Sequence, residues 1–141
     1  MKNNVLIEMI SVQITLDERT ETKLITEGTF EEKAFGYVIS YEDSEATGFV
    51  GSVTRIAVMK NRATASIRRM GTSNTSLMLE KDKKHYCYYS TPYGDMRIGV
   101  HTNAIESQLD ETGGNLVLKY TIDMNSAYMS ENEIYMTIKP L

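Results

Sequence analysis

The chain has 141 residues and a mass of 16.0 kDa, a size suited to one domain with its own hydrophobic core. Apolar residues make up 41% of the chain, charged residues 24%, and there are two prolines and nine glycines, which excludes collagen-like and low-complexity disordered proteins. The formal net charge of −4 argues against indiscriminate binding to nucleic acid. We therefore expect a single folded domain over residues 1–141.

Apolar residues recur at every second position along most of the chain, which is the pattern of half-buried β-strands. In chain order, the expected strands cover 12–16, 24–30, 37–41, 50–58, 63–69, 77–79, 85–90, 96–102, 116–124 and 134–138. Short polar or glycine-containing segments separate them, including a turn at Thr91-Pro92-Tyr93-Gly94. The spacing of Ile105 and Leu109 predicts one helical turn.

This succession of strands predicts an all-β fold. Consecutive antiparallel strands with short turns favour an up-and-down meander of about 8 to 10 strands closed into a β-barrel. Closure leaves no exposed strand edge, which is an advantage over an open sheet. A sandwich of two sheets is the alternative architecture.

Features that would indicate export are missing from the sequence. Cys87 is the single cysteine, so an internal disulfide is excluded. Glu8 interrupts the apolar run at residues 5–7, and no stretch approaches the roughly 18 apolar residues of a membrane-spanning helix. We therefore predict a cytoplasmic protein.

The charges are unevenly distributed along the chain. Residues 55–84 contain eight basic and two acidic residues, whereas the remainder contains seven basic and seventeen acidic residues. The basic segment has two interpretations: a surface for an anionic ligand or an acidic protein partner, or a region whose charge is compensated by neighbouring acidic strands.

A series of short motifs runs along nearly the whole chain. In order, they are Ile39-Ser40-Tyr41-Glu42-Asp43, Thr47-Gly48-Phe49-Val50-Gly51-Ser52-Val53-Thr54, Arg69-Met70-Gly71, Tyr89-Ser90-Thr91-Pro92-Tyr93-Gly94, Thr102, Gly113-Gly114 with Tyr120, and Ser130-Glu131-Asn132. Their order and spacing together resemble the YwiB-like family of bacterial β-barrel proteins. The resemblance implies a calycin-like, lipocalin-type barrel and no particular activity. The chain has no tryptophan, so the Gly-x-Trp signature of typical lipocalins cannot occur, and lipid transport is not expected.

Five polar residues share the inward parity of the apolar residues in their strands. They are Tyr41, Thr54, Arg69, Thr102 and Tyr120. The same five positions belong to the motifs of the family resemblance. We predict that these side chains point into the barrel.

Arg69 stands out because Arg68 precedes it directly, and two adjacent residues of a strand face opposite sides of the sheet. We expect Arg69 to be the more buried of the two. A buried guanidinium needs a carboxylate or several carbonyl groups, and Asp43 and Glu45 are the candidate partners. Arg69 then serves either a ligand carboxylate or phosphate, or an internal ion pair that closes the barrel.

His85, Cys87 and His101 are the conventional soft metal ligands of the chain. The turn at Pro92-Tyr93-Gly94 joins the strand that contains His85 and Cys87 to the strand that contains His101. If this turn has three residues, His85 lies opposite His101; if it has two or four, His101 lies on the other face. A structural zinc site needs four ligands, so we predict neither a metal nor another cofactor. No base or oxyanion hole can be assigned around Cys87, so we predict no catalytic residue and no enzyme.

The sequence thus predicts a protein that binds a small polar or anionic ligand inside the barrel through the five inward residues. The alternative is a protein-interaction or structural module with a packed interior, whose basic segment 55–84 binds an acidic partner. A cavity of about 300 Å³ or more near Arg69 and Tyr120 would favour the first function, and a filled barrel the second. We expect a monomer or homodimer, with neither membrane nor nucleic acid as a partner.

Overall fold

The structure is a computed structural model that describes residues 2–72, 74–91, 94–125 and 127–141, so the predicted turn residues Pro92 and Tyr93 lie outside it. Its regular elements are all strands: β1 (Lys2–Ile14), β2 (Arg19–Lys33), β3 (Gly36–Glu42), β4 (Ser52–Met59), β5 (Thr64–Gly71), β6 (Thr75–Glu80), β7 (Lys84–Thr91), β8 (Gly94–Asp110), β9 (Gly113–Met124) and β10 (Ala127–Pro140). The prediction of an all-β fold is confirmed.

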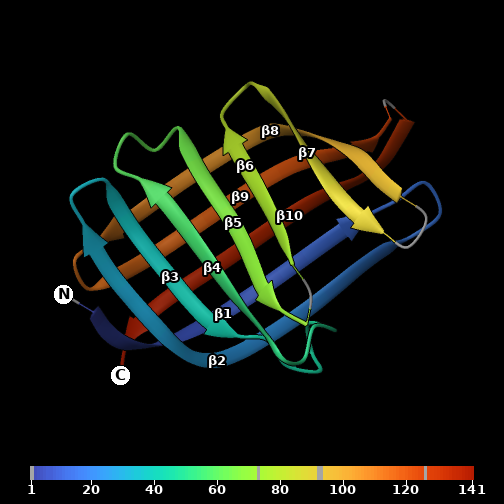
Figure 1. Ribbon diagram of the computed structural model, residues 1–141. Coiled ribbons are helices and arrows are strands. Elements are labelled where there is room, and N and C mark those ends of the chain that lie inside the picture. Colours follow the sequence, from blue (N-terminus) through green and yellow to red (C-terminus); the bar gives the residue numbers. More distant parts are fainter. Residues whose placement is uncertain (1, 73, 92–93, 126) are drawn as a thin grey trace.

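The strands form one antiparallel meander in the order β6-β5-β4-β3-β2-β1-β10-β9-β8-β7, in which the first and last strands of the chain pair with each other. The sheet wraps around into a nearly closed barrel (Figure 1). Within the described residues, no ladder joins the two end strands, β6 and β7. Near the turn between them, Lys81 forms a parallel bridge with Thr102 of β8, which closes part of the gap. The predicted barrel is therefore confirmed.

The inward face changes from apolar to polar along several strands. In β1, Val5, Ile7 and Met9 are buried, and the inward positions that follow are Ser11 and Gln13. The largest fully buried apolar side chains fill the apolar part of the barrel; they are Phe30, Ile7, Ile39, Ile56, Leu79, Leu116, Leu118, Val5, Val58 and Val100. Burial of this apolar surface is the main force that stabilises the fold. The polar part of the interior, which this apolar core does not fill, is available for a site.

The helical turn predicted from Ile105 and Leu109 is wrong, because both residues lie inside β8. Ile105, Ser107 and Leu109 are all buried and alternate with exposed or half-buried residues, as in any half-buried strand. The polar Ser107 interrupted the apolar alternation and left a helix-like spacing of four. A register shift between Thr102 and Ala104 brings both Thr102 and Ile105 inward although their numbers differ in parity.

Several predicted strand boundaries are also wrong, and β1, β2, β8 and β10 are much longer than expected. The first strand covers Lys2–Ile14 rather than 12–16, and Leu16 lies beyond its end with an exposed side chain. Val50 lies in the loop before β4 rather than in the strand. Leu16 and Val50 are misplaced because an apolar residue in a loop can continue the two-residue period by chance. Within the described residues, no helix has the length and apolar composition needed to cross a membrane.

Candidate functional site

Four inward side chains from adjacent strands form a continuous polar row. In the register of β3 to β6, Tyr41 lies opposite Thr54, Thr54 opposite Arg69, and Arg69 opposite Thr75. Directly opposed residues share one face of the sheet, with Cβ atoms about 5 Å apart. The next inward row on the same strands is apolar and consists of Ile39, Ile56, Ile67 and Leu77. The polar row thus lies above an apolar floor.

A second polar row comes from the other half of the sheet. Thr20 lies opposite Gln13, Gln13 opposite Asn132, Asn132 opposite Tyr120, and Tyr120 opposite Thr102. These residues belong to β2, β1, β10, β9 and β8. Hydroxyl and amide groups therefore line both halves of the interior at this level.

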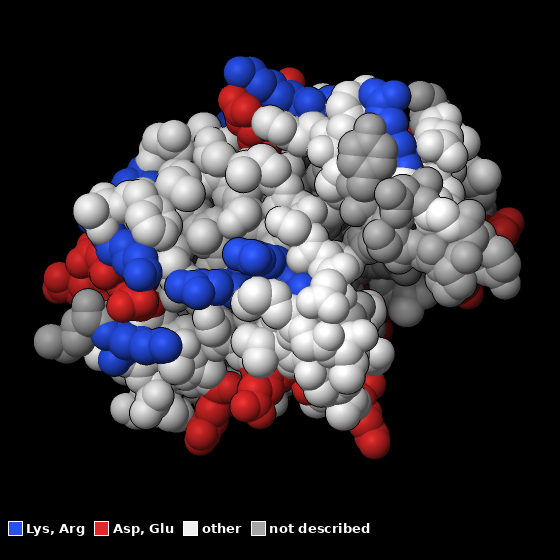
Figure 2. All heavy atoms as spheres, in the orientation of Figure 1, with Lys and Arg blue, Asp and Glu red and all other residues white. Residues whose placement is uncertain are grey.

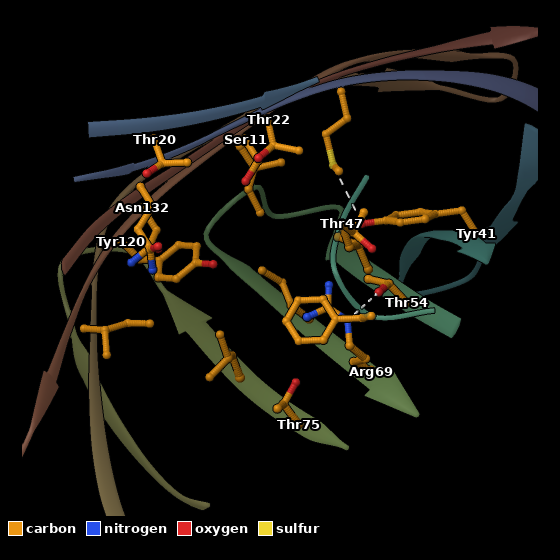
Figure 3. A pocket seen from close by; sticks show the side chains of 18 residues that line it. Ser11, Thr20, Thr22, Tyr41, Thr47, Thr54, Arg69, Thr75, Tyr120 and Asn132 are labelled. Carbon is orange, nitrogen blue, oxygen red and sulfur yellow. Dashed lines mark hydrogen bonds between the residues drawn. The ribbon is translucent and has the colours of Figure 1, made fainter. Parts of the chain in front are cut away.

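The two rows face each other across a cavity of about 410 Å³. Figure 3 shows Thr20, Asn132 and Tyr120 on one side of it, and Tyr41, Thr54 and Arg69 on the other. Among the described residues that line the cavity, Arg69 is the only charged one. The lining consists of Met9, Ser11, Gln13, Thr20, Thr22, Tyr41, Thr47, Phe49, Thr54, Ile56, Ile67, Arg69, Thr75, Leu77, Tyr120, Ile122, Asn132 and Ile134.

Arg69 forms an ion pair with the buried carboxylate of Asp43. Arg69 Nε lies 3.3 Å from Asp43 Oδ2, and the Asp43 side chain has no solvent exposure. Thr54 Oγ1 donates to Asp43 Oδ2 at 2.7 Å and accepts from Arg69 Nε at 3.1 Å, and Thr47 Oγ1 donates to Asp43 Oδ1 at 3.1 Å. The expected pairing of Arg69 with an acid of the 42–45 region is therefore present, and the carboxylate is fully hydrogen-bonded.

The loop between β3 and β4 brings Asp43 and Phe49 to Arg69. The N–H of Asp43 donates to the carbonyl of Ser52 at 2.8 Å, which joins the two ends of the loop. Gly51, with φ of +90°, adopts a left-handed conformation that favours glycine. The Phe49 ring lies 3.8 Å from the Arg69 guanidinium carbon, so a cation–π contact covers one flat face of the guanidinium. The edge of the guanidinium remains the part that can meet a ligand.

Tyr41 lines the cavity, and its hydroxyl is available to a ligand. It donates to the sulfur of Met9 at 3.7 Å, and a thioether is a weak acceptor. Burial raises the pKa of Tyr41, and the nearby negative charge of Asp43 adds to this effect. Tyr41 therefore stays protonated and can donate a hydrogen bond to a better acceptor than sulfur.

Four of the five predicted site residues line this cavity, namely Tyr41, Thr54, Arg69 and Tyr120. Arg69 is half-buried while Arg68 is exposed, as expected from their strand parity. Thr102 is completely buried beside Tyr120, but it does not line the cavity, and its hydroxyl has no hydrogen-bond partner among the residues that the structure describes. Thr102 is therefore the member of the predicted set that stands apart from the others.

Sequence reasoning missed several residues that line the cavity. Gln13, Thr20, Thr75 and Asn132 lie in the polar rows, and Phe49 reaches the cavity from a loop. Thr20 shares its parity with Leu24, but the polar run at residues 17–22 is typical of a turn and hides this signal. No sequence signal identifies Phe49, since its position depends on how the loop folds back.

His85, Cys87 and His101 do not form a common cluster. The register pairs Lys84 with His101 and His85 with Val100, so His101 faces the side of the sheet opposite to His85 and Cys87. Of the two predicted arrangements, the one with His101 on the other face is therefore observed. His85 Nε2 instead lies 2.9 Å from Glu80 Oε1. Burial raises the pKa of the Cys87 thiol, which reduces its reactivity as a nucleophile.

The fold and its polar interior define a calycin-like β-barrel with an internal cavity. Residues 7–136 match the family described as a domain of unknown function, DUF1934, and the chain belongs to this family. The structure is also similar to the crystal structure of the ywiB protein from Bacillus subtilis, with a TM-score of 0.74 and 16% sequence identity over 96% of this chain and 92% of that one. This likeness confirms the resemblance to YwiB-like proteins and concerns the fold. A comparison with curated proteins finds no match.

Proposed function

We propose that the protein binds a small polar, anionic molecule in the cavity between the two polar rows. The observation that carries this proposal is the position of Arg69, whose guanidinium borders a cavity of about 410 Å³ and is otherwise surrounded by hydroxyl, amide and apolar groups. A cavity of this size is in the range of small-molecule sites. A barrel that served only as a packed scaffold would gain stability from filling it.

The hydrogen bonds of Arg69 leave donors for a ligand. Its Nε atom donates to Asp43 and Thr54, its Nη2 atom donates to Asp43, and the guanidinium also interacts with the Tyr41 hydroxyl. A guanidinium carries five N–H donors, so its outer edge keeps donors that the described residues do not use. A carboxylate or phosphate can accept hydrogen bonds from such a free guanidinium edge. Asp43 already balances the charge of Arg69, so the site favours a ligand with a single negative charge and several hydrogen-bonding groups.

The rest of the interior limits the length of the ligand. The apolar floor of Ile56, Ile67 and Leu77 lies two residues below the polar row, a distance of about 7 Å along the strands. Beyond the floor, fully buried residues such as Phe30 and Leu79 fill the barrel. These features support a compact ligand, with an apolar part on the floor and its polar groups at the rows, over a long acyl chain.

The composition of the lining supports binding rather than catalysis. Among the described residues that line the cavity, none is His, Cys, Asp, Glu or Lys. These residue types supply most general acids, bases and nucleophiles in enzymes. Asp43, the nearest carboxylate, is saturated by hydrogen bonds from Thr47, Thr54 and Arg69. We therefore propose a binding protein without enzymatic activity.

Native mass spectrometry of the protein purified from its own host tests this proposal. We expect a small acidic molecule bound at one copy per chain and released when the protein is unfolded. Tyr41→Phe removes only the hydroxyl that now contacts sulfur, and we expect it to lower the retained ligand about ten-fold, the usual cost of one lost hydrogen bond. Tyr135→Phe, on the outer side of β10, is the matched control and should retain it. A protein that is free of ligand, or equal retention in both variants, would contradict the proposal.

A further inference from the structure

Two arginines oppose each other on the outer surface of the barrel. Arg55 of β4 lies directly opposite Arg68 of β5, and both side chains are exposed. Among the described residues, neither arginine forms an ion pair. Like charges at directly opposed positions destabilise an antiparallel pair. The fold therefore carries an unfavourable contact here that no neighbouring acid relieves.

Several other basic residues of the barrel form ion pairs. Lys60 lies 3.3 Å from Glu32, Lys83 lies 2.9 Å from Glu80, and Lys84 forms an ion pair with Asp123. Within the basic segment, these lysines are paired with acids, whereas Arg55 and Arg68, like Arg62 and Lys81, form no ion pair among the described residues. In the view of Figure 2, basic side chains lie over the middle of the molecule and acidic ones lie along its lower rim. The exposed surface at the two arginines is suited to an anionic partner.

Exposed apolar side chains accompany the two arginines. Val53 and Met70 lie opposite each other on the same outer face, and Met78 follows on β6. Met70 and Met78 are exposed by 37% and 46%, respectively. Together with Arg55 and Arg68, these three residues form what we call the arginine face. A mixture of flexible methionines and cations is typical of surfaces that bind peptides.

A groove runs beside the arginine face, along the gap between β6 and β7. Its volume is about 500 Å³, and it is lined by Arg68, Arg69, Met70, Asn74, Thr75, Ser76, Met78, Tyr86 and Cys87. The Tyr86 ring lies 3.9 Å from the guanidinium carbon of Arg97, and this contact orients the ring at the groove. Because β6 pairs only with β5 in the described ladder, its other edge faces this groove.

We propose that the protein binds an extended acidic peptide segment of a partner protein, which adds as a strand to the free edge of β6. The unpaired edge supplies backbone hydrogen bonds, which is the basis of strand addition. Arg68, which lines the groove, pairs with a carboxylate of the peptide, and Met70, Met78 and Tyr86 contact its apolar side chains. The arginine face lies on the outside of the barrel, whereas the groove shares Arg69 and Thr75 with the lining of the interior cavity.

The geometry favours a peptide over nucleic acid. Binding of single-stranded nucleic acid relies on a basic track together with aromatic platforms for the bases. Among the described residues of the groove, Tyr86 is the only aromatic one, and Arg97 already stacks on its ring. The apolar residues of the arginine face are aliphatic, and an extended peptide with alternating acidic and apolar side chains complements them.

Fluorescence anisotropy tests the proposal with a labelled peptide of about eight residues that alternates Glu and Val, long enough to form one strand. We expect binding to the wild-type protein and a loss of at least about ten-fold in affinity for Arg68→Glu, because a contact between opposite charges becomes a repulsion. Arg55→Glu changes a charge on β4, outside the lining of the groove, and should lower the affinity by less than Arg68→Glu does. Lys23→Glu, an exposed charge change on β2, is the matched control and should bind as the wild type does.

The backbone contribution is tested with a second peptide in which the two central valines are replaced by proline. Proline cannot donate a backbone hydrogen bond, so we expect its affinity to fall about ten-fold or more. Unchanged binding by Arg68→Glu, equal binding of the proline peptide, or a dissociation constant weaker than about 1 mM for the first peptide would overturn the proposal. Tighter binding of oligothymidylate than of the acidic peptide would also overturn it.

Discussion

Asp43 and Arg69 connect the loop after β3 to the inner face of β5, with Arg69 Nε 3.3 Å from Asp43 Oδ2. Asp43 is inaccessible to solvent, whereas the Arg69 side chain remains 18% exposed. The acid of this pair is therefore fully buried, whereas its base is partly accessible. Asp43 holds the loop in place, and Arg69 faces the cavity, so this ion pair contributes both to the fold and to the proposed site.

Replacing Arg69 should be much more harmful than replacing its neighbour. Arg69→Ala leaves the Asp43 carboxylate buried without its cation, and we expect the free energy of unfolding to fall by about 3 kcal/mol. Arg68→Ala removes an exposed arginine and should cost at most about 1 kcal/mol. Urea titrations of the two variants measure the difference. Equal costs would show that the pair contributes little to stability.

This pair also shows how far the sequence alone leads. Strand parity identified Arg69 as the inward arginine, because Ala65 and Ile67 share its face and alternation persists through β5. The position of Asp43 continues the parity of Tyr41, so the acid partner could be proposed as well. The opposite row could not be assembled in this way, since the pairing of Tyr120 with Asn132 depends on the register of β9 and β10, which a bulge between Tyr128 and Ser130 shifts.

Tyr41 should make the stability of the protein sensitive to alkaline pH. Its pKa is raised above the ordinary value of 10.0, chiefly by burial, so the native state keeps a proton that the unfolded state loses. This contribution is fully present below pH 10.0 and is lost as the pH rises through the higher native pKa. Tyr41→Phe removes the ionisable group, so the variant should lose less stability above pH 10.0 than the wild type.

Urea unfolding of both proteins below and above pH 10.0 measures this effect. Tyr86→Phe is the control, because that side chain is half-exposed and lies outside the cavity. Identical alkaline losses in the wild type and Tyr41→Phe would contradict the buried position of the phenol.

The turn between β8 and β9 should depend on glycine for a steric reason. Gly114 has φ of +134°, and a Cβ atom placed on it would lie 2.0 Å from the carbonyl oxygen of Gln108. Gly94 has φ of +114°, but a Cβ atom there would meet nothing within 4 Å. Both alanine variants carry backbone strain of about 1–2 kcal/mol, and only Gly114→Ala adds the clash. We therefore expect a clearly lower melting temperature for Gly114→Ala than for Gly94→Ala, and equal values would contradict the close approach.

The most direct measurement of the central claim is ligand occupancy when the cavity is filled. Thr75 faces the cavity and the adjacent Ser76 is exposed, so Thr75→Trp places an indole inside while Ser76→Trp places one outside. Native mass spectra of both variants, purified from the host and checked for folding by circular dichroism, give the occupancy. The account predicts that the wild type and Ser76→Trp retain the small acidic ligand and that Thr75→Trp loses it. Equal occupancy in all three proteins would contradict a ligand site inside the barrel.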